Sequence, residues 1–352
     1  MFMEYLQLKD VCYINMGQSP DSSSYNDCGE GLPFFQGNAD FGERYPVTRV
    51  WSSMPTKKAN ANDILISVRA PIGALNYAKE LCCIGRGLAA LTPNTEKVSP
   101  EFIFWMLKGK NAELNSKGTG STFKAISKKV LEEIKVPNID LDTQKVYSGN
   151  LEKTYKIIQL RKQQLQQLDE LVKSRFVELF DGKGYPTLKW NDVFNTTTGK
   201  LDSNAMVENG EYPFFTCAKE VLKIDNYAFD QEALLLAGNN AAGKYDVKYY
   251  KGKFNAYQRT YVLGLKGDWS YQLFRYQLED KLVYLQEQSL GGLTKYLTLK
   301  ILGELDFIVP PMNKQNEFAD FVKEVDKSKF VVQKALDEAQ LLFDSLMQEY
   351  FG

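Results

Sequence analysis

The segment 239–259 combines basic residues with tyrosines and side-chain amides, a mixture that suits contacts to nucleic acid. Its five lysine and arginine residues stand against a single acid, Asp246. Lysine neutralises phosphates whatever the base sequence, whereas Asn, Gln and Arg carry the donors and acceptors that distinguish base edges. We predict DNA contacts from Asn239, Asn240, Lys244, Lys248, Lys251, Lys253, Tyr257, Gln258 and Arg259. A solvated β-hairpin with ordinary charge alternation is the competing interpretation.

The first half of the chain carries sparser candidates of the same kind. One arginine follows an apolar, strand-like run, and another lies between two glycines that leave the backbone accessible. The segment 118–124 is rich in glycine and hydroxyl groups, whose exposed amides suit a phosphate, and 291–296 is its counterpart. These segments add Arg69, Arg86, Ser121, Thr122, Lys124, Thr294 and Lys295 to the predicted DNA contacts. Structural ion pairs and plain turns would explain the same residues.

The chain offers no catalytic chemistry of its own. Residues 238–244 fit the first positions of a P-loop, but Tyr245 stands where Ser or Thr should hold magnesium, and the following residues alternate like a strand. The chain has no histidine, and its five cysteines show no C-x-x-C spacing, which excludes histidine-based catalysis and cysteine zinc sites. It also lacks a glycine-rich SAM loop and the amino-methyltransferase motif. We predict no catalytic residue, no metal site and no cofactor held by this chain.

The composition of the chain permits packed domains and does not by itself indicate a partner. Apolar residues make up 44% of the 352 residues, and the net charge is −1. Because a phosphate senses charge only within about 10 Å at ordinary salt, local clusters matter more than this total. No apolar run approaches the length of a membrane span, and the first residues lack a secretory pattern. We expect a cytoplasmic protein with reduced thiols and no membrane contact.

The two halves of the chain repeat one another at a nearly constant offset, which is the mark of a duplicated architecture. The offset drifts in the first part of each half, and from Leu131 onward it stays at 171 residues. The matched positions are Asp10 with Asp192, Gly17 with Gly199, Phe34 with Phe214, 63–66 with 233–236, Arg86 with Arg259, Leu131 with Leu302, and Gln144 with Gln315.

The last stretch of each half predicts a long helix with one apolar seam. Apolar residues step by four and three along both stretches, as in a coiled coil, and neither stretch contains proline. Each would run roughly 55 Å at 1.5 Å per residue. The predicted interface residues are Leu151, Ile158, Leu165, Leu168, Val172, Leu179, Val322, Val325, Val332, Leu336, Phe343 and Leu346. Packing of each seam onto its own domain is the alternative, and two equal seams favour mutual pairing.

Turn signals divide the chain into four parts. Glycines followed by Pro186 end the first long helix, and Pro137 and Pro310 close the two preceding bodies. We predict domains at 1–143 and 187–314, and long helices at 144–181 and 315–352. Each domain mixes short apolar strands with helical pieces. The predicted fold class is α+β, with two similar α/β domains separated by two long helices.

This order of parts resembles the specificity subunit of Type I restriction–modification systems, and the resemblance covers essentially the whole chain. Four short strings are similar to recurring strings of that family, at 63–69, 121–126, 235–238 and 258–263. Each string alone is weakly specific. Their order, together with the repeated helix, is strongly specific.

The resemblance implies a non-catalytic subunit that reads a bipartite target on double-stranded DNA through two target-recognition domains. It implies that the two helices pair antiparallel as a coiled coil, with the domains in a pseudo-twofold internal repeat. It further implies two methyltransferase subunits and restriction (nuclease–translocase) subunits as partners, which would bind SAM, ATP and Mg²⁺. The two bodies differ in their loops, so the two half-sites should differ as well.

Two rival interpretations remain at the level of the sequence. A specificity subunit of a methyltransferase-only or other restriction-like system would need the same residues with different partners. A coiled-coil scaffold that does not bind DNA would show no salt-dependent DNA affinity. The sequence specifies neither the target bases nor the length of the unread spacer.

Overall fold

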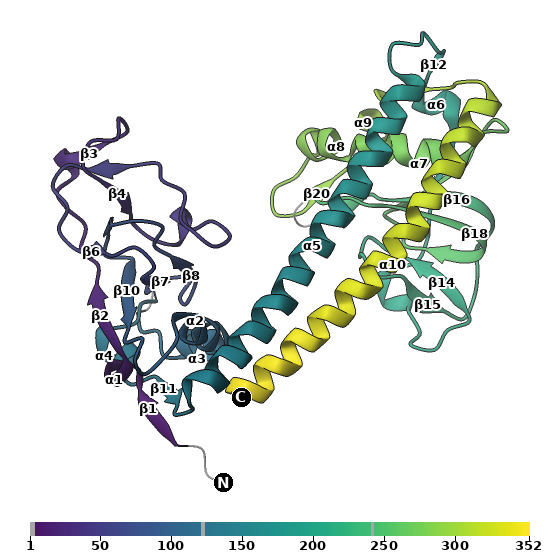
Figure 1. Cartoon of the computed structure of the whole chain (residues 1–352). Helices are drawn as coiled ribbons and strands as arrows, with labels where there is room; N and C mark the ends of the chain where they lie inside the picture. Colours follow the sequence, from purple (N-terminus) through teal and green to yellow (C-terminus); the bar gives the residue numbers. More distant parts are fainter. Residues whose placement is uncertain (1–3, 121–123, 241–242) are drawn as a thin grey trace. The chain divides into compact units, whose positions relative to one another are not determined.

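The structure, a computed structural model, describes residues 4–120, 124–240 and 243–352. The chain forms two compact units, one of residues 1–163 and 333–352 and the other of 164–332. Each long helix therefore contributes one part to each unit, and the rest of each unit is called here its body (Figure 1). None of the helices in the described ranges has both the length and the apolar composition that a bilayer span requires.

The body of the first unit is built on two sheets. One has the antiparallel order β2-β10-β7-β8, and the other has the order β3-β5-β4-β9-β6, in which β4 and β9 run parallel. Central strand β7 is completely buried, and its residues Ile64 to Ile66 are apolar, as expected of a strand covered on both faces. The strands are β1 (Tyr5–Gln7), β2 (Cys12–Met16), β3 (Tyr25–Asn26), β4 (Leu32–Phe35), β5 (Trp51–Ser52), β6 (Lys58–Ala59), β7 (Ile64–Ser67), β8 (Leu75–Tyr77), β9 (Cys82–Ile84), β10 (Leu88–Pro93) and β11 (Lys135–Pro137).

Helix α2 (Pro100–Gly109) joins this body to the long helices. Ser99 caps its first turn by accepting a hydrogen bond from the Phe102 amide at 3.1 Å, and proline occupies the next position. Trp105 is fully buried and contacts the ring of Tyr155 on the first long helix, with ring centres 5.3 Å apart. The remaining helices of this body are α1 (Leu8–Val11), α3 (Asn111–Ser116) and α4 (Lys128–Glu132).

The body of the second unit contains one larger sheet in the order β13-β19-β16-β18-β14-β15. Strand β18 follows the P-loop-like segment, so the prediction of a strand rather than a helix there is confirmed. The strands are β12 (Thr187–Lys189), β13 (Phe194–Thr198), β14 (Tyr212–Phe215), β15 (Leu222–Ile224), β16 (Phe229–Ala237), β17 (Asn239–Asn240), β18 (Val247–Ala256), β19 (Thr260–Leu265), β20 (Lys295–Tyr296) and β21 (Asp306–Ile308). The helices are α6 (Trp190–Val193), α7 (Tyr271–Asp280), α8 (Leu282–Gln288) and α9 (Leu299–Gly303).

The two bodies repeat one another more closely than the sequence indicates. The caps of α2 and α7, Ser99 and Ser270, are 171 positions apart, the offset found along the long helices. The fully buried Phe102 and Leu273 follow at the same offset. Outside α2 and α7, α3 and α8 correspond, as do α4 and α9. The constant part of the repeat therefore begins at the cap of α2 and not only at Leu131.

The long helices α5 (Leu141–Phe180) and α10 (Met312–Phe351) run antiparallel within each unit. In the first unit the rings of Tyr147 and Tyr350 stack with centres 3.8 Å apart. In the second unit Phe318 packs against Phe176 and Phe180, with both centre distances 5.6 Å. The start of one helix thus meets the end of the other in both units. The predicted fold class, two repeated α/β bodies with antiparallel long helices, is confirmed.

The twelve predicted seam residues lie on the inner sides of these helices. Leu151 is fully buried, and Ile158 is 2% exposed. The buried members are Leu151, Ile158, Val172, Leu179, Val325, Val332 and Phe343, and the half-buried members are Leu165, Leu168, Val322, Leu336 and Leu346. Within each unit the seam also packs onto its body, since Leu151 shares a core with Trp105 and Val172 shares one with Leu273. Both expected modes of packing therefore occur together.

Candidate nucleic-acid interface

Three backbone segments of the first body meet at the end of strand β7. The amide of Val68 donates to the carbonyl of Gly87 at 2.9 Å, and the amide of Ile126 donates to the carbonyl of Val68 at 2.9 Å. This junction brings together Arg69, Arg86 and Lys124, which the sequence placed far apart, and all three side chains are exposed. The predicted contacts Ser121 and Thr122 lie outside the described residues.

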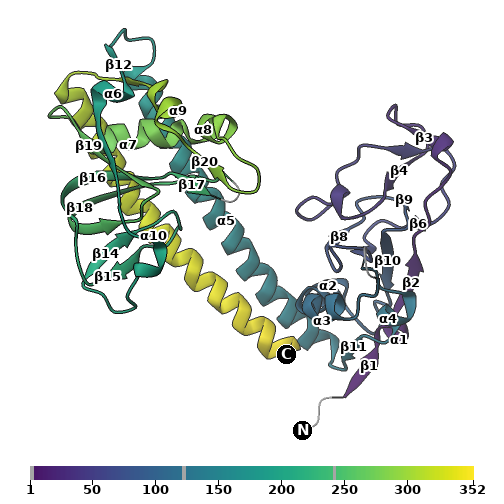
Figure 2. The same cartoon turned by 180° about the vertical axis from the view of Figure 1, so that it is seen from behind.

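The second body forms the same junction from different residues. The amide of Gly238 donates to the carbonyl of Arg259 at 2.8 Å, and the amide of Leu297 donates to the carbonyl of Gly238 at 2.8 Å. The short strands β17 and β20 pair beside it, with Asn240 opposite Lys295 (Figure 2). Asn239, Asn240, Gln258, Arg259, Thr294 and Lys295 are thereby gathered at one edge of the body.

The equivalence of the two junctions corrects one alignment made from the sequence. The carbonyls of Leu88 and Thr260 accept hydrogen bonds from Gly17 and Gly199, so that Leu88 and Thr260 correspond. Arg86 is therefore the counterpart of Gln258, and its predicted match with Arg259 is wrong by one residue. The preceding loops differ in length between the two bodies, so the number of residues that separates equivalent positions changes there. Matching Arg86 with Arg259 by residue type concealed this change.

Each junction carries three basic side chains, and these charges are not neutralised locally. Arg69, Arg86 and Lys124 form no ion pair with any residue in the described ranges, and the same holds for Lys244, Arg259 and Lys295. Lys244 belongs to the second junction because a Cβ placed on the preceding Gly243 would lie 3.4 Å from Cγ of Lys295. Lys295 is half-buried, and the other five cations are exposed. Uncompensated cations beside side-chain amides are the arrangement that binds a phosphate backbone and reads base edges.

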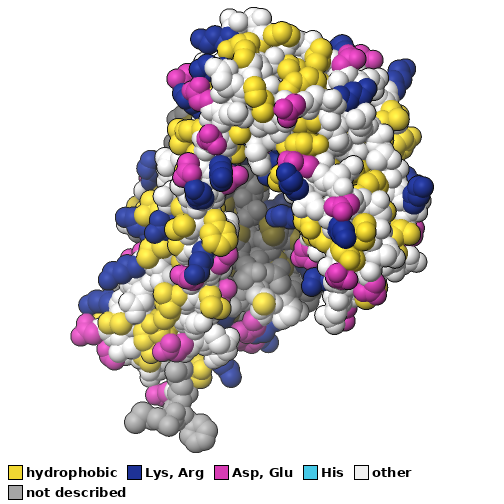
Figure 3. Space-filling view, turned by 90° about the vertical axis from the view of Figure 1, so that its right-hand side faces the viewer, with side chains coloured by type: hydrophobic (Ala, Val, Ile, Leu, Met, Phe, Trp, Pro, Cys, Tyr) yellow, Lys and Arg dark blue, Asp and Glu magenta, His cyan; other side chains and the backbone are white. Residues whose placement is uncertain are grey.

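Three predicted lysines lie along β18. Lys248 lies at the end nearer the junction, because its ammonium donates to the carbonyl of Ala218 at 2.9 Å and the neighbouring Cys217 thiol donates to the carbonyl of Arg259 at 3.4 Å. The ammonium of Lys248 pairs with Asp246, and its side chain is only 15% exposed. Lys251 pairs with Glu232 at 3.0 Å, and the Lys253 ammonium lies 4.6 Å from the ring centre of Tyr227. Since β18 pairs with β16 from Val247 opposite Leu236 to Phe254 opposite Phe229, Lys253 lies at the opposite end of the strand from the junction. The face of the molecule drawn in Figure 3 carries basic and acidic side chains intermixed. A DNA contact of these three lysines stays a prediction.

The remaining predicted contacts border the second junction. Gln258 is exposed, and its amide donates to Asp202 at 3.3 Å. Tyr257 is half-buried, and its backbone amide donates to Phe215. The loop that holds Thr294 also projects Leu293, which is 95% exposed, and Tyr296, which is 40% exposed. Sequence reasoning passed over these two side chains, although apolar and aromatic groups beside basic ones are the usual partners of nucleic-acid bases.

The titratable groups of the structure do not suggest an activated nucleophile. Burial raises the pKa of the Cys12 and Cys82 thiols to about 12, which disfavours the reactive thiolate. Burial likewise raises the pKa of Cys83. Across the part of the chain that the structure describes, His, Cys, Asp and Glu side chains form no group of three or more that could hold a metal ion.

Comparison with known proteins places the chain in one family. The profile of the Type I restriction modification DNA specificity domain matches residues 3–170 and again 183–339. A Methanocaldococcus jannaschii protein described as a type I restriction enzyme specificity subunit is 44% identical over 170 residues, which are 48% of this chain and 40% of that protein. The Escherichia coli EcoDI specificity subunit is 37% identical over 139 residues, 39% of this chain and 30% of that protein.

A solved structure supports the fold over the whole length. The S subunit of a Type I restriction–modification system from M. genitalium superposes with a TM-score of 0.68 at 15% identity, covering 99% of this chain and 96% of that chain. The curated relatives are matched over less than half of their own length. Two copies of the family domain, one in each half and each holding one junction, show that the chain belongs to the family of Type I restriction modification DNA specificity domains.

Proposed function

We propose that this chain is the sequence-specific DNA-recognition subunit of a Type I restriction–modification complex. The duplicated junction is the observation that carries the proposal. Each body presents three uncompensated cations around its junction, and of these only the lysine, Lys124 or Lys295, occupies an equivalent position in both bodies. Cations supply affinity for the phosphate backbone, and the neighbours that differ between the bodies supply selection of bases. Each body would then read its own half of a bipartite target.

The chain acts in this proposal without catalysing a reaction. It directs partner subunits to the DNA, and those partners bind SAM, ATP and Mg²⁺ and carry out methylation and cleavage. Recognition of cellular DNA places this work in the cytoplasm.

The long helices offer a surface for two copies of the methyltransferase subunit. Leu160 of α5 and Leu342 of α10 are 53% and 52% exposed in the first unit. Their counterparts at the 171-residue offset, Val331 and Leu171, are 65% and 47% exposed in the second unit. Exposed apolar side chains mark a protein contact where they gather into one patch on the surface. Since the same pair recurs in each unit, one kind of partner can bind twice.

Mapping of methylated adenines tests the function. Genomes of cells with and without this gene, each carrying the partner methyltransferase gene, should differ by one bipartite motif with an unread spacer. The purified chain alone should neither methylate nor cut DNA when it is given SAM, ATP and Mg²⁺, and activity should appear when the methyltransferase is added. An identical methylation pattern in both genomes would overturn the proposal, and so would turnover by the pure chain. Leu171→Asp and Leu342→Asp together should prevent assembly with the methyltransferase.

A further inference from the structure

A buried glutamine near the start of each long helix makes two equivalent side-chain hydrogen bonds in both units. Gln144 and Gln315 are each 1% exposed, and they occupy equivalent positions of the repeat. Both lie in the first turn of their helices, α5 and α10. Glutamine with its full donor and acceptor capacity is rarely buried unless every polar atom is paired. The hydrogen-bond partners of the two side chains therefore indicate their structural role.

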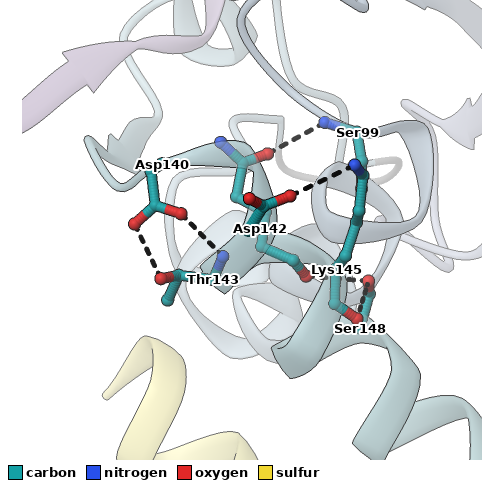
Figure 4. A network of polar contacts seen from close by, with 7 residues as sticks. Ser99, Asp140, Asp142, Thr143, Lys145 and Ser148 are labelled. Carbon is teal, nitrogen blue, oxygen red and sulfur yellow. Dashed lines mark hydrogen bonds and ion pairs between the residues drawn. The ribbon is translucent and has the colours of Figure 1, made fainter.

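The side-chain amide of each glutamine bonds its long helix to the cap of the body's helix and to the segment just before the long helix. In the first unit, Oε1 of Gln144 accepts from the backbone amide of Ser99, which is labelled in Figure 4, at 2.8 Å. Nε2 donates to the carbonyl of Ile139 at 2.9 Å. Nε2 also donates to the carbonyl of Lys97 at 3.1 Å. Ser99 is the cap of α2, so the long helix is bonded directly to the first residue of the body's main helix.

The second unit repeats this geometry with different neighbours. Oε1 of Gln315 accepts from the backbone amide of Ser270 at 2.9 Å, and Nε2 donates to the carbonyl of Pro310 at 2.8 Å. Ser270 is the cap of α7, and Pro310 precedes the glutamine by the same five residues as Ile139 does in the first unit. Two bodies with dissimilar loops thus keep one identical connection.

Apolar packing alone would not hold the body at one position on the helix. Helix α2 touches the long helices through rings, such as Trp105 against Phe343 at 5.6 Å, and α7 does so through Tyr276 against Phe318 at 5.2 Å. Such contacts are non-directional and tolerate sliding. Hydrogen bonds weaken steeply when they are misaligned, and a buried amide left unpaired is costly. The glutamine therefore helps to set where along the helix, and at what rotation, the body sits, together with the ion pair of Arg44 with Glu152 at 2.7 Å in the first unit.

We propose that Gln144 and Gln315 are positioning residues, which fix the direction in which each recognition body leaves its long helix and so restrict the spacer lengths that the chain accepts. This inference rests on the proposed function for its consequence on DNA, but the joint itself is a property of each unit. With the joint intact, a target of the wrong spacing can be bound only by straining these hydrogen bonds. With the joint loosened, bodies can shift to meet half-sites at other spacings.

The joint can be tested without DNA. Nitroxide labels at Lys129→Cys on α4 and Lys156→Cys on α5, with Cys28 and Cys217 replaced by serine, report the distance between body and helix within the first unit. Gln144→Leu, which keeps the volume and removes the amide, should broaden the distance distribution. Ser148→Ala is the matched control, because it removes a buried hydroxyl whose bonds, to the carbonyls of Gln144 and Lys145, stay inside α5. An equal distribution in Gln144→Leu and Ser148→Ala would overturn the joint.

The consequence is tested on the full chain assembled with its methyltransferase. Substrates carry the mapped half-sites at the natural spacing and with one base pair added or removed. For Gln144→Leu and Gln315→Leu, the ratio of methylation at the natural spacing to that at the altered spacings should fall severalfold, and Ser148→Ala should keep the wild-type ratio. Equal loss at every spacing would assign the glutamines to stability alone and overturn the inference. If the wild-type assembly shows no sequence-dependent methylation, the proposed function fails, whereas the label measurement still decides the joint.

Discussion

Removal of the three cations at the second junction should change the salt dependence of DNA binding by a calculable amount. Lys244→Ala, Arg259→Ala and Lys295→Ala together remove three charges that form no ion pair with the described residues. If each contacts one phosphate, the slope of log K against log salt becomes shallower by about 0.9 per contact, or about 2.7 in total. Over a fourfold rise in salt, the wild type should then lose about 40-fold more affinity than the triple variant.

Fluorescence anisotropy of the chain assembled with its methyltransferase, titrated onto a duplex with both half-sites at several salt concentrations, measures this slope. Lys251→Ala with Lys253→Ala is the matched control, because both side chains are exposed but lie along β18, away from the junction. The control should leave the slope nearly unchanged, and thermal melting should show that both variants fold. If the control flattens the slope and the triple variant does not, the interface lies along β18 and the reasoning from the junction is refuted.

Three further predictions concern single features. Arg69→Ala should relax selection at one base pair of one half-site, at a cost of about 1–3 kcal/mol if the arginine reads guanine; methylation sequencing would contradict this by showing relaxation in both half-sites. Insertion of one heptad after Leu165 and another after Leu336 adds about 10 Å of helix, so the spacer should grow by about three base pairs. Two-residue insertions should abolish activity, because they rotate the apolar seam away from its partner. An active heptad variant with the original spacer would show that the helices do not set the spacer length. Near pH 8, iodoacetamide should modify the exposed Cys28 and spare Cys12 and Cys82, because pKa values near 12 leave these two buried thiols almost no thiolate until the chain is unfolded. Peptide mass spectrometry measures the modification of all three cysteines. Fast modification of Cys12 in the folded chain would contradict its burial.

The long helices and the repeat could be predicted because their signals are local and periodic. The seam residues repeat every three or four positions, and an apolar stripe of that period has one structural solution over such a length. Gln144 and Gln315 could be matched for the same reason, because no insertion interrupts the 171-residue offset between the two long helices. The helix start differs slightly from the predicted 144 because the Asp140 carboxylate accepts a hydrogen bond from the Thr143 amide at 2.9 Å, which caps the helix earlier.

The candidate interface could be predicted only in part, because it is assembled from distant segments. The types of Arg69 and Lys124 indicated a role, but their proximity depends on a backbone bridge between Arg69 and Ala125 that no local pattern announces. The prediction weighted Lys248, Lys251 and Lys253 by charge alone. Their pairing depends on which acids β16 and neighbouring segments bring beside them, as Glu232 does for Lys251.

The constant offset that begins at Ser99 and Ser270 has a consequence for how such a chain can change. Length differences between the halves are confined to the residues before these two caps, where loops tolerate insertion. Everything after them, including the lysine of each junction and the joint to the long helix, keeps its place. The part of each body that precedes its cap can therefore be replaced without altering the residues that follow. Under the proposed function, such a replacement would change the bases recognised in one half-site and leave the long helices, and so the spacer, unchanged.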